Sequence, residues 1–453
     1  MSDGCHGARL KIKLSSTNIR IGKTKTTKLV PTILETYSSI KNYYNNVLNH
    51  DKTLVKTTND EPTPINCVEE MIGKIPLCIF QNPNLKWFDP CCGCGNFFVV
   101  VYKYLKQYHS VKHILTNMLY FNDINTDRTS IVKSVFCDDV YKLNITNCDY
   151  LEYGMENTYD IIVANPPYAK LMKNGKRASK NHNLIGAFIN KSFELLREGG
   201  YLLFITPNNW MSKSNRNILI MEITRKQILH LNIHTAKKYF KKIGSSFTWY
   251  LIENVPHYKD ITVEGVYKKV NYTSNVKSEI RSYIPLFYTR IIQSILAKTI
   301  DNKKLMKFSV ETSSDLHKYT KKTCIRVIKD DTFKYKLHHT PSQTVWANRP
   351  HKFQEGYKVF IGTTSYYNVF VDDCGMTQSI AFIRCPDKKT AEIYKRVLEH
   401  PLYVFINNIC RWGNFNNVRI LQLFPLCNNH ELVYELFNIT NEEIEFISAH
   451  IKK

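Results

Sequence analysis

Residues 85–105 have the sequence LKWFDPCCGCGNFFVVVYKYL, an apolar run of strand length followed by a glycine turn and a helical pattern. Further runs of strand length occur at MLYFND (118–123), DIIVAN (160–165) and YLLFITP (201–207). Helical patterns separate these runs, and each run ends in polar or turn-forming residues. This alternation predicts a doubly wound α/β sheet, in which ligands bind at the carboxyl ends of the strands.

The length of 453 residues predicts two to three domains. We expect residues 1–60 to form a basic extension with one amphipathic helix, which begins near Pro31 and serves as packing surface. The α/β domain is predicted over residues 61–257. Residues 258–453 are predicted to form a second domain of mixed α and β character, because the regular alternation ends there.

Local signals refine this outline. A helical pattern from Leu184 to Leu196 is predicted to end at Gly199 and Gly200, since glycine is typical of helix C-termini. In the second domain, YKVFIGTT (357–364) and SIAFIRC (379–385) have the aromatic and β-branched composition of strands.

The charge balance points to a polyanionic partner. Sixty-two Lys and Arg residues outnumber 39 Asp and Glu residues, giving a net charge of +23. Such an excess favours binding to nucleic acid, although Lys- and Asn-rich composition also follows from an AT-rich genome. The sequence offers no signal peptide and no apolar run of membrane-spanning length, so we expect a cytoplasmic protein with reduced thiols. Cys91, Cys92 and Cys94 lack the spacing of a zinc site, and we expect no metal.

The motif Asn165-Pro166-Pro167-Tyr168 directly follows the strand DIIVA. An exocyclic adenine amine is a weak nucleophile, because its lone pair is delocalised into the ring. The side-chain oxygen of Asn165 and the carbonyl of Pro166 are two acceptors for the amine hydrogens, and together they would direct the lone pair. Successive prolines restrict the backbone that carries this carbonyl. Tyr168 offers an aromatic face on which a base can stack.

Polar residues at the other strand ends suit a nucleoside with an amino-acid part. Asp89 precedes a turn in which Gly93 and Gly95 allow close approach of the backbone to a ligand, and it is a candidate for an ammonium group. Asp123 follows the next strand, where a carboxylate would hold ribose hydroxyls. Asp149 is a candidate acceptor for the amine of the cofactor's adenine.

Taken together, these segments resemble the gamma class of adenine-N6 DNA methyltransferases, of the TaqI and Eco57I types. FDPCCGCGNFF (88–98) is similar to the family's glycine loop, and TPINCVEEMI (63–72) is similar to the segment before it. NHNLIGAFINKSFELLREGGYLLFITPNNWM (181–211) and YFKKIGSSFTWYLIE (239–253) resemble later blocks. The likeness covers residues 61–257 closely. Residues 1–60 have no recognised counterpart, and 258–453 are only loosely similar.

The resemblance implies a Rossmann-like, S-adenosylmethionine-dependent catalytic domain at 61–257 and a target-recognition domain at 258–453. It implies that the catalytic residues are Asn165, Pro166, Pro167, Tyr168 and Phe240, with Phe247 as the alternative second aromatic residue. It implies that S-adenosylmethionine is bound by Thr63, Pro64, Asp89, Pro90, Gly93, Gly95, Phe97, Asp123, Ile124, Asp149, Tyr150 and Asn165.

The resemblance therefore predicts a site-specific DNA methyltransferase that flips an adenine out of the duplex and methylates its N6 amine directly. Double-stranded DNA is the expected partner, held by the N-terminal arm, by the second domain and by lysines such as Lys170, Lys173 and Lys176. We expect a monomer. A separate restriction endonuclease is a further partner that the resemblance allows. The alternatives are methylation of RNA adenine or of a protein glutamine, or a catalytically silent DNA-binding or specificity module.

Overall fold

The computed structural model describes residues 30–51, 53–54, 61–154, 158–168, 184–214, 217–240, 246–364 and 366–451. The chain divides into two compact units. Unit 1 comprises Met1–Thr206, Tyr239–Gly244 and Trp249–Asn254. Unit 2 comprises Pro207–Lys238, Ser245–Thr248 and Val255–Lys453. The predicted basic arm and Lys170, Lys173 and Lys176 lie outside the described residues.

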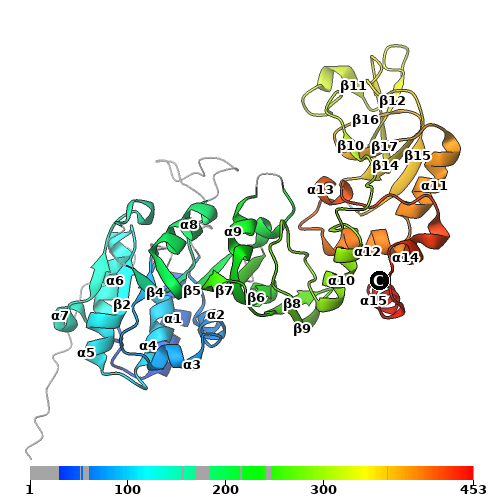
Figure 1. The fold of residues 1–453 in the computed structure, drawn as a ribbon. Coiled ribbons are helices and arrows are strands. Elements are labelled where there is room, and N and C mark those ends of the chain that lie inside the picture. Colours follow the sequence, from blue (N-terminus) through cyan, green and yellow to red (C-terminus); the bar gives the residue numbers. More distant parts are fainter. Residues whose placement is uncertain are drawn as a thin grey trace, which may run out of the picture. The chain divides into compact units, whose positions relative to one another are not determined.

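Unit 1 alternates strands with helices (Figure 1). Its helices and helical turns are α1 (Tyr37–Asn46), η1 (Leu48–His50), α2 (Ile65–Ile72), α3 (Leu77–Gln81), α4 (Asn96–Leu105), α5 (Val111–His113), η2 (Ile114–Met118), α6 (Thr126–Val135), α7 (Asp138–Tyr141), η3 (Tyr150–Glu152) and α8 (Ile185–Leu195). Its strands are β1 (Trp87–Asp89), β2 (Leu119–Asn122), β3 (Asn144–Thr146), β4 (Tyr159–Ala164) and most of β5 (Leu196–Pro207) and β7 (Phe247–Pro256).

These strands belong to a nine-stranded sheet with the order β3-β2-β1-β4-β5-β7-β6-β8-β9. The chain moves outward from β1 through β2 to β3 and then returns to place β4 on the other side of β1. Strands β1 to β5 pair in parallel. The four predicted strand runs of this region are thereby confirmed, as is the doubly wound order. The carboxyl ends of the neighbouring strands β1 and β4 mark the switch point, where ligand sites form in such sheets.

Apolar side chains on both faces of these short strands explain why helices cover them. All six residues of β4 are buried, and Phe88 of β1 stacks on Tyr159 with ring centroids 4.3 Å apart. A strand buried on both faces has a continuous apolar run in place of alternation, as DIIVA does. Helices α1, α2 and α3 all contact α4.

Two local predictions were wrong. The N-terminal helix begins at Tyr37, not near Pro31, because the side chain of Thr36 accepts a hydrogen bond from the amide of Ser39 and caps the helix there. Helix α8 ends at Leu195, and Gly199 and Gly200 lie within β5. The β4–β5 register jumps from Tyr159↔Leu196 to Ile161↔Tyr201, so the glycines form a bulge rather than a helix stop.

Unit 2 has mixed α and β structure, as predicted for the C-terminal part of the chain. Its strands are β6 (Lys226–Ile233), β8 (Ile261–Tyr267), β9 (Val270–Val276), β10 (Glu311–Thr312), β11 (Ile325–Arg326), β12 (Tyr335–Thr340), β13 (Gln343–Ala347), β14 (Lys358–Gly362), β15 (Val369–Asp372), β16 (Gly375–Met376) and β17 (Ile380–Arg384). The predicted strands in 357–364 and 379–385 are therefore confirmed as β14 and β17.

The helices and helical turns of unit 2 are η4 (Asn208–Met211), α9 (Leu219–Arg225), η5 (Thr235–Lys238), α10 (Arg290–Lys298), η6 (Lys322–Cys324), α11 (Lys388–Leu398), α12 (Pro401–Ile409), α13 (Val418–Leu421), η7 (His430–Leu432), α14 (Val433–Leu436) and α15 (Asn441–Ile451). Two four-stranded sheets have the orders β10-β17-β14-β15 and β11-β13-β12-β16. No helix among the described residues is both long and apolar enough to cross a bilayer.

Candidate active site

Three strands of unit 1 bring polar residues to one edge of the sheet. Strand β1 ends at Asp89, β2 is followed by Asp123, and β4 is followed by Asn165. The parallel registers Asp89↔Phe121 and Phe88↔Ile162 keep these ends level. The sheet therefore gathers the predicted site residues at the switch point.

The loop between β1 and α4 is fixed by backbone hydrogen bonds and by one carboxylate. The Gly93 amide donates to Oδ2 of Asp123 at 2.8 Å, and the Asn125 amide donates to Oδ1 of the same residue at 2.8 Å. The Cys92 amide donates to the carbonyl of Asn122 at 2.9 Å. Gly93 and Gly95 have φ angles of 54° and 90°, in the region that favours glycine. Asp123 thus holds the glycine loop as well as standing at the predicted ribose position.

Asp89 is buried beneath this loop, with 1% of its surface exposed. Its Oδ1 accepts a hydrogen bond from the Cys91 amide at 3.2 Å, while its buried Oδ2 has no hydrogen-bond partner among the described residues. Burial, reinforced by the negative charge of Asp123, raises the pKa of Asp89 well above its usual value. A buried carboxyl oxygen without a donor is costly, and a cationic or N–H group on a ligand would relieve that cost.

The side chain of Asn165 is held in a defined orientation. Its Nδ2 donates to Oγ1 of Thr63 at 3.0 Å and to the carbonyl of Glu61 at 3.2 Å. Its Oδ1 accepts a hydrogen bond from the hydroxyl of Tyr168. Since both amide hydrogens are engaged on one side, the opposite side of the amide presents its oxygen as an acceptor. Burial raises the pKa of Tyr168 well above its usual range, so its hydroxyl remains a donor.

An open cavity of about 550 Å³, solvent space included, lies against this arrangement. It is lined by Leu48, Asn49, Leu54, Glu61, Pro62, Thr63, Cys91, Cys92, Gly93, Cys94, Asn96, Phe97, Arg128 and Asn165. Thr63, Gly93, Phe97 and Asn165 were predicted site residues, and the cavity brings them together.

Other predicted residues do not line the cavity. Pro64 immediately precedes α2, and Pro90 lies in the loop after β1. Ile124 is 70% exposed. Asp149 accepts a hydrogen bond from the Leu151 amide, and the buried Tyr150 forms a hydroxyl–hydroxyl hydrogen bond with Ser192 at 2.9 Å.

The two candidates for the second aromatic residue are both buried. Phe240 is 3% exposed and belongs to unit 1, whereas Phe247 is 2% exposed, begins β7 and belongs to unit 2. Either assignment remains a prediction.

Sequence reasoning missed the contribution of the N-terminal segment and of α6. Leu48, Asn49 and Leu54 line the cavity, although the helical stripe in this segment was predicted to be packing surface. Arg128, in the first turn of α6, also lines it. An apolar helical stripe predicts burial but not the surface that it covers, and a single arginine has no distinguishing pattern.

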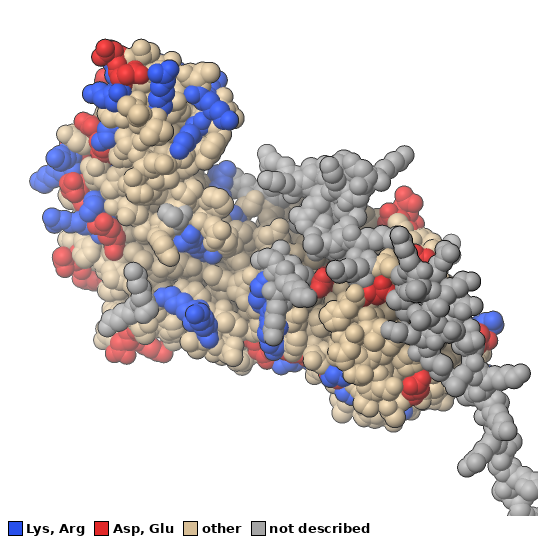
Figure 2. Space-filling view, turned by 180° about the vertical axis from the view of Figure 1, so that it is seen from behind, with Lys and Arg blue, Asp and Glu red and all other residues tan. Residues whose placement is uncertain are grey.

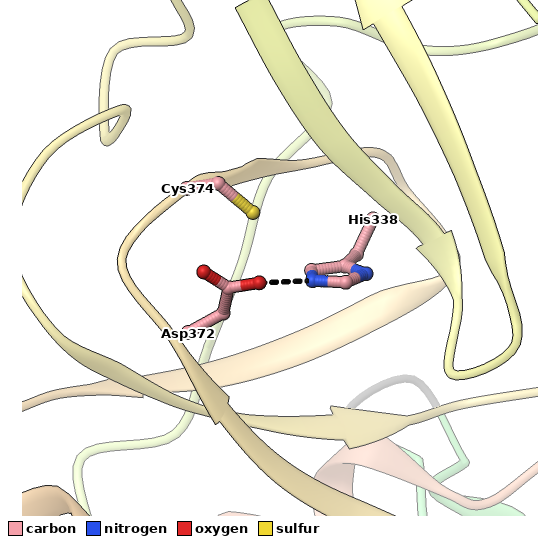
Figure 3. Close-up of side chains that lie close together, drawn as sticks. All are labelled: His338, Asp372 and Cys374. Carbon is pink, nitrogen blue, oxygen red and sulfur yellow. Dashed lines mark hydrogen bonds and ion pairs between the residues drawn. The ribbon is translucent and has the colours of Figure 1, made fainter.

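A second cluster of reactive side chains lies in unit 2. Figure 3 shows His338 of β12 directed at Asp372 of β15, and the ligand atoms of His338, Asp372 and Cys374 all lie within 4.8 Å of one another. His338 Nε2 lies 2.8 Å from Oδ2 of Asp372, and Nζ of Lys336 donates to the same oxygen at 2.7 Å. These donor types suit zinc. However, the Lys336 ammonium neutralises the carboxylate and would repel a divalent cation, so we interpret the group as a network that joins β12 to β15.

Comparison with known proteins bears on the sheet-edge site of unit 1. Residues 96–240 match the model of the Eco57I restriction-modification methylase family. The predicted family resemblance is confirmed. The matched segment contains Asp123 and the Asn165–Tyr168 motif, whereas Thr63, Asp89, Gly93 and Gly95 precede it.

Two curated relatives agree with this match. The chain is 33% identical over 89 residues to the Type II methyltransferase M.TthHB8I of Thermus thermophilus, covering 16% of this chain and 21% of that protein. It is 28% identical over 157 residues to the Type II methyltransferase M.VspI of a Vibrio species, covering 32% of this chain and 35% of that protein. The matches thus span about a fifth to a third of these relatives.

Solved structures extend the similarity of fold beyond the segment that matches the family. The Type IIL restriction-modification enzyme MmeI in complex with DNA gives a TM-score of 0.51 at 11% identity, covering 87% of this chain and 70% of that one. The Type ISP enzyme LlaGI, in complex with a DNA substrate mimic, gives a TM-score of 0.51 at 12% identity, covering 91% and 58%. Both matches show that the fold of this chain is similar to that of restriction-modification enzymes.

Proposed function

We propose that this protein transfers a methyl group from S-adenosylmethionine to the N6 amine of a flipped-out adenine in double-stranded DNA. The observation that carries the proposal is the orientation of Asn165, whose amide nitrogen is bonded to Thr63 and Glu61 and whose oxygen is presented as an acceptor. The match to the Eco57I family supports the reaction class.

The residues around the glycine loop fit the proposed cofactor. The buried Oδ2 of Asp89, which has no partner among the described residues, suits the ammonium group of the methionine part. Gly93 lines the cavity with open space at the position of a side chain, so a ligand can approach its backbone. Asp123 would accept hydrogen bonds from ribose hydroxyls. When bound, S-adenosylmethionine supplies a methyl group already activated on a sulfonium sulfur.

Asn165 and Pro166 would direct the substrate amine. Oδ1 of Asn165 and the carbonyl of Pro166 each accept one amine hydrogen, which draws the nitrogen toward tetrahedral geometry and frees its lone pair. In the structure, Oδ1 accepts the hydroxyl of Tyr168, so substrate binding exchanges that hydroxyl for the amine. Preorganised alignment of this kind is worth up to about 7–11 kcal/mol. Asparagine is no strong base, and the amine proton passes to solvent after transfer.

Aromatic stacking would hold the flipped base. Tyr168 stacks on one face of the adenine, and Phe240 stacks on the other, with Phe247 as the alternative. Base–aromatic stacking contributes about 1–3 kcal/mol per base. This gain offsets the cost of extruding a nucleotide from the duplex, which is roughly a few kcal/mol.

Basic residues on unit 2 suit the phosphate backbone of the substrate. Figure 2 shows Lys and Arg side chains spread over the lobe that carries β11–β17. The exposed cations of this lobe include Lys321, Lys322, Arg326, Lys329, Lys334, Arg349, Lys352 and Arg384. We propose that residues 258–453 bind DNA and read its sequence, which predicts affinity that falls steeply with salt.

The deciding experiment is transfer of tritiated methyl from S-adenosylmethionine to AT-rich duplex DNA, followed by nucleoside analysis. The wild type is expected to produce N6-methyladenine, and Asn165→Ala is expected to lose this activity. Asn82→Ala is a matched control, because Asn82 is an exposed turn residue that accepts a hydrogen bond from the Asn84 amide. Label in RNA or in protein glutamine, with none in DNA, would refute the substrate assignment.

A further inference from the structure

The N-terminal segment is built into the wall of the cavity in unit 1. Leu48, Asn49 and Leu54 line the cavity, and both leucines are buried. The hydroxyl of Tyr44, a fully buried side chain of α1, donates to the carbonyl of Cys94 at 2.6 Å. Helix α1 is thereby attached to the glycine loop itself.

A buried amide continues this attachment. Asn96, the first residue of α4, donates from Nδ2 to Oδ1 of Asn49 at 2.9 Å and to the carbonyl of Thr63 at 2.8 Å. One side chain therefore joins the N-terminal segment to the segment that also bonds Asn165. Asn49 is fixed at the cavity wall by this contact.

Arg128 completes this side of the cavity. Its Nε and Nη2 donate to the carbonyl of Leu54 at 3.2 and 2.7 Å, so the N-terminal segment holds the guanidinium in place. Among the described residues that line the cavity, Arg128 carries the one permanent positive charge. The neighbouring acids are Glu61 in the lining, Asp123 on the loop and the buried Asp89.

The amino-acid part of S-adenosylmethionine carries two opposite charges. Asp89 suits the ammonium group, but the acids around the loop would repel the α-carboxylate wherever no cation faces it. A guanidinium is the best match for a carboxylate, since its planar N–H donors fit both oxygens. Arg128 lies at the cavity with its orientation fixed by a backbone carbonyl.

We propose that Arg128, supported by Tyr44, Asn49 and Leu54 of the N-terminal segment, forms the subsite for the α-carboxylate of the cofactor. This inference rests on the proposed function, because it assumes a ligand with an amino-acid part. It assigns Leu48, Asn49 and Leu54, which have no counterpart in the predicted family pattern, to cofactor binding. Asn49 lines the same cavity as Arg128.

The test compares three ligands by isothermal titration calorimetry. S-adenosylhomocysteine has the α-carboxylate, its decarboxylated analogue retains the amine alone, and 5′-methylthioadenosine lacks the amino-acid part. Arg128→Met is expected to weaken S-adenosylhomocysteine binding roughly 10- to 100-fold, the effect of losing a hydrogen-bonded ion pair. Its affinity for the other two ligands is expected to stay within about threefold. Lys133→Met, which removes an exposed positive charge from the same helix, is the matched control.

A second variant tests the charge without removing Arg128. Asn49→Asp retains the oxygen that accepts the Asn96 hydrogen bond and adds a negative charge beside the subsite. It is expected to weaken S-adenosylhomocysteine binding and to leave the decarboxylated, cationic analogue bound as well as before or better. This opposite response separates an electrostatic effect from a loss of structure.

Two results would overturn the inference. One is an Arg128→Met protein that binds S-adenosylhomocysteine as tightly as the wild type. The other is an equal loss of affinity for all three ligands, which would make Arg128 a structural residue that only anchors Leu54. A wild-type protein that binds neither S-adenosylhomocysteine nor 5′-methylthioadenosine would instead refute the proposed function, and with it this inference.

Discussion

Alanine at Gly95 and alanine at Gly93 should have different effects, although the two glycines are two residues apart. A Cβ at Gly95 would lie 2.9 Å from Cε2 of Phe136, in a backbone with φ of 90°. The conformational cost is about 1–2 kcal/mol and the overpacking cost about 1–3 kcal/mol. Gly95→Ala is therefore expected to lower the free energy of unfolding of unit 1 by about 2–5 kcal/mol.

At Gly93 a Cβ would meet nothing within 4 Å, and φ is 54°. The conformational cost alone predicts that Gly93→Ala lowers the free energy of unfolding by about 1–2 kcal/mol. However, Gly93 lines the cavity, so the added methyl group takes space that the ligand would occupy. Gly93→Ala is thus expected to keep most of its stability. Its affinity for S-adenosylhomocysteine is expected to fall about tenfold or more, because the ligand would be overpacked against the added methyl group.

Differential scanning fluorimetry and calorimetric titration of both variants measure the two effects separately. A loss of 1 kcal/mol lowers the melting temperature by about 2–4 °C for a domain of this size class. Equal melting temperatures for Gly95→Ala and Gly93→Ala would refute the predicted difference in stability. The predicted loss of affinity is refuted if Gly93→Ala binds the ligand as the wild type does.

Three further predictions concern single side chains. Tyr168→Phe keeps the ring for stacking and should retain activity within a few fold. Tyr168→Ala removes the ring and should lose about 1–3 kcal/mol of transition-state stabilisation. Equal kcat/KM values for the two variants would contradict this prediction. Burial lowers the pKa of His351 to about 4, below its ordinary value of 6.5, and its Nδ1 accepts the Phe353 amide, so protonation favours unfolding. Stability should therefore fall as the pH drops from 7 toward 4, and the melting temperature of His351→Gln should fall less; an identical fall would contradict the assignment. Tyr44→Phe removes the buried hydrogen bond to Cys94 and should lower unit 1 stability by about 1–2 kcal/mol in urea unfolding, while an unchanged midpoint would show that the bond contributes nothing.

The strands of unit 1 could be predicted because their signals are local. A run such as DIIVA is apolar throughout, and its length and flanking residues indicate a buried strand. The Asn165–Tyr168 motif directly follows this strand in the sequence, so it must lie at the edge of the sheet where the strand ends. The order of the strands alone therefore predicts that Asp89, Asp123 and Asn165 lie at the same edge of the sheet.

Long-range packing could not be predicted in the same way. The stripe that includes Tyr44 and Leu48 indicated a buried helix face, but nothing in it specified that this face covers the glycine loop. Gly199 and Gly200 have the composition of a helix stop, yet pairing with β4 begins at Leu196 and places them in a bulge. In both cases tertiary contacts overrode or completed a local signal.

The attachment of α1 to the glycine loop has a practical consequence for anyone who expresses part of this gene. The segment that matches the methylase family begins at residue 96, directly after the loop. A fragment cut at that position would contain α4 without β1, without Gly93 and Gly95, and without the helix whose Tyr44 reaches Cys94. The apolar face of α4 would then be exposed, and the fragment would be prone to aggregation. For this protein, the smallest piece worth purifying begins before Thr36, where the N-terminal helix is capped.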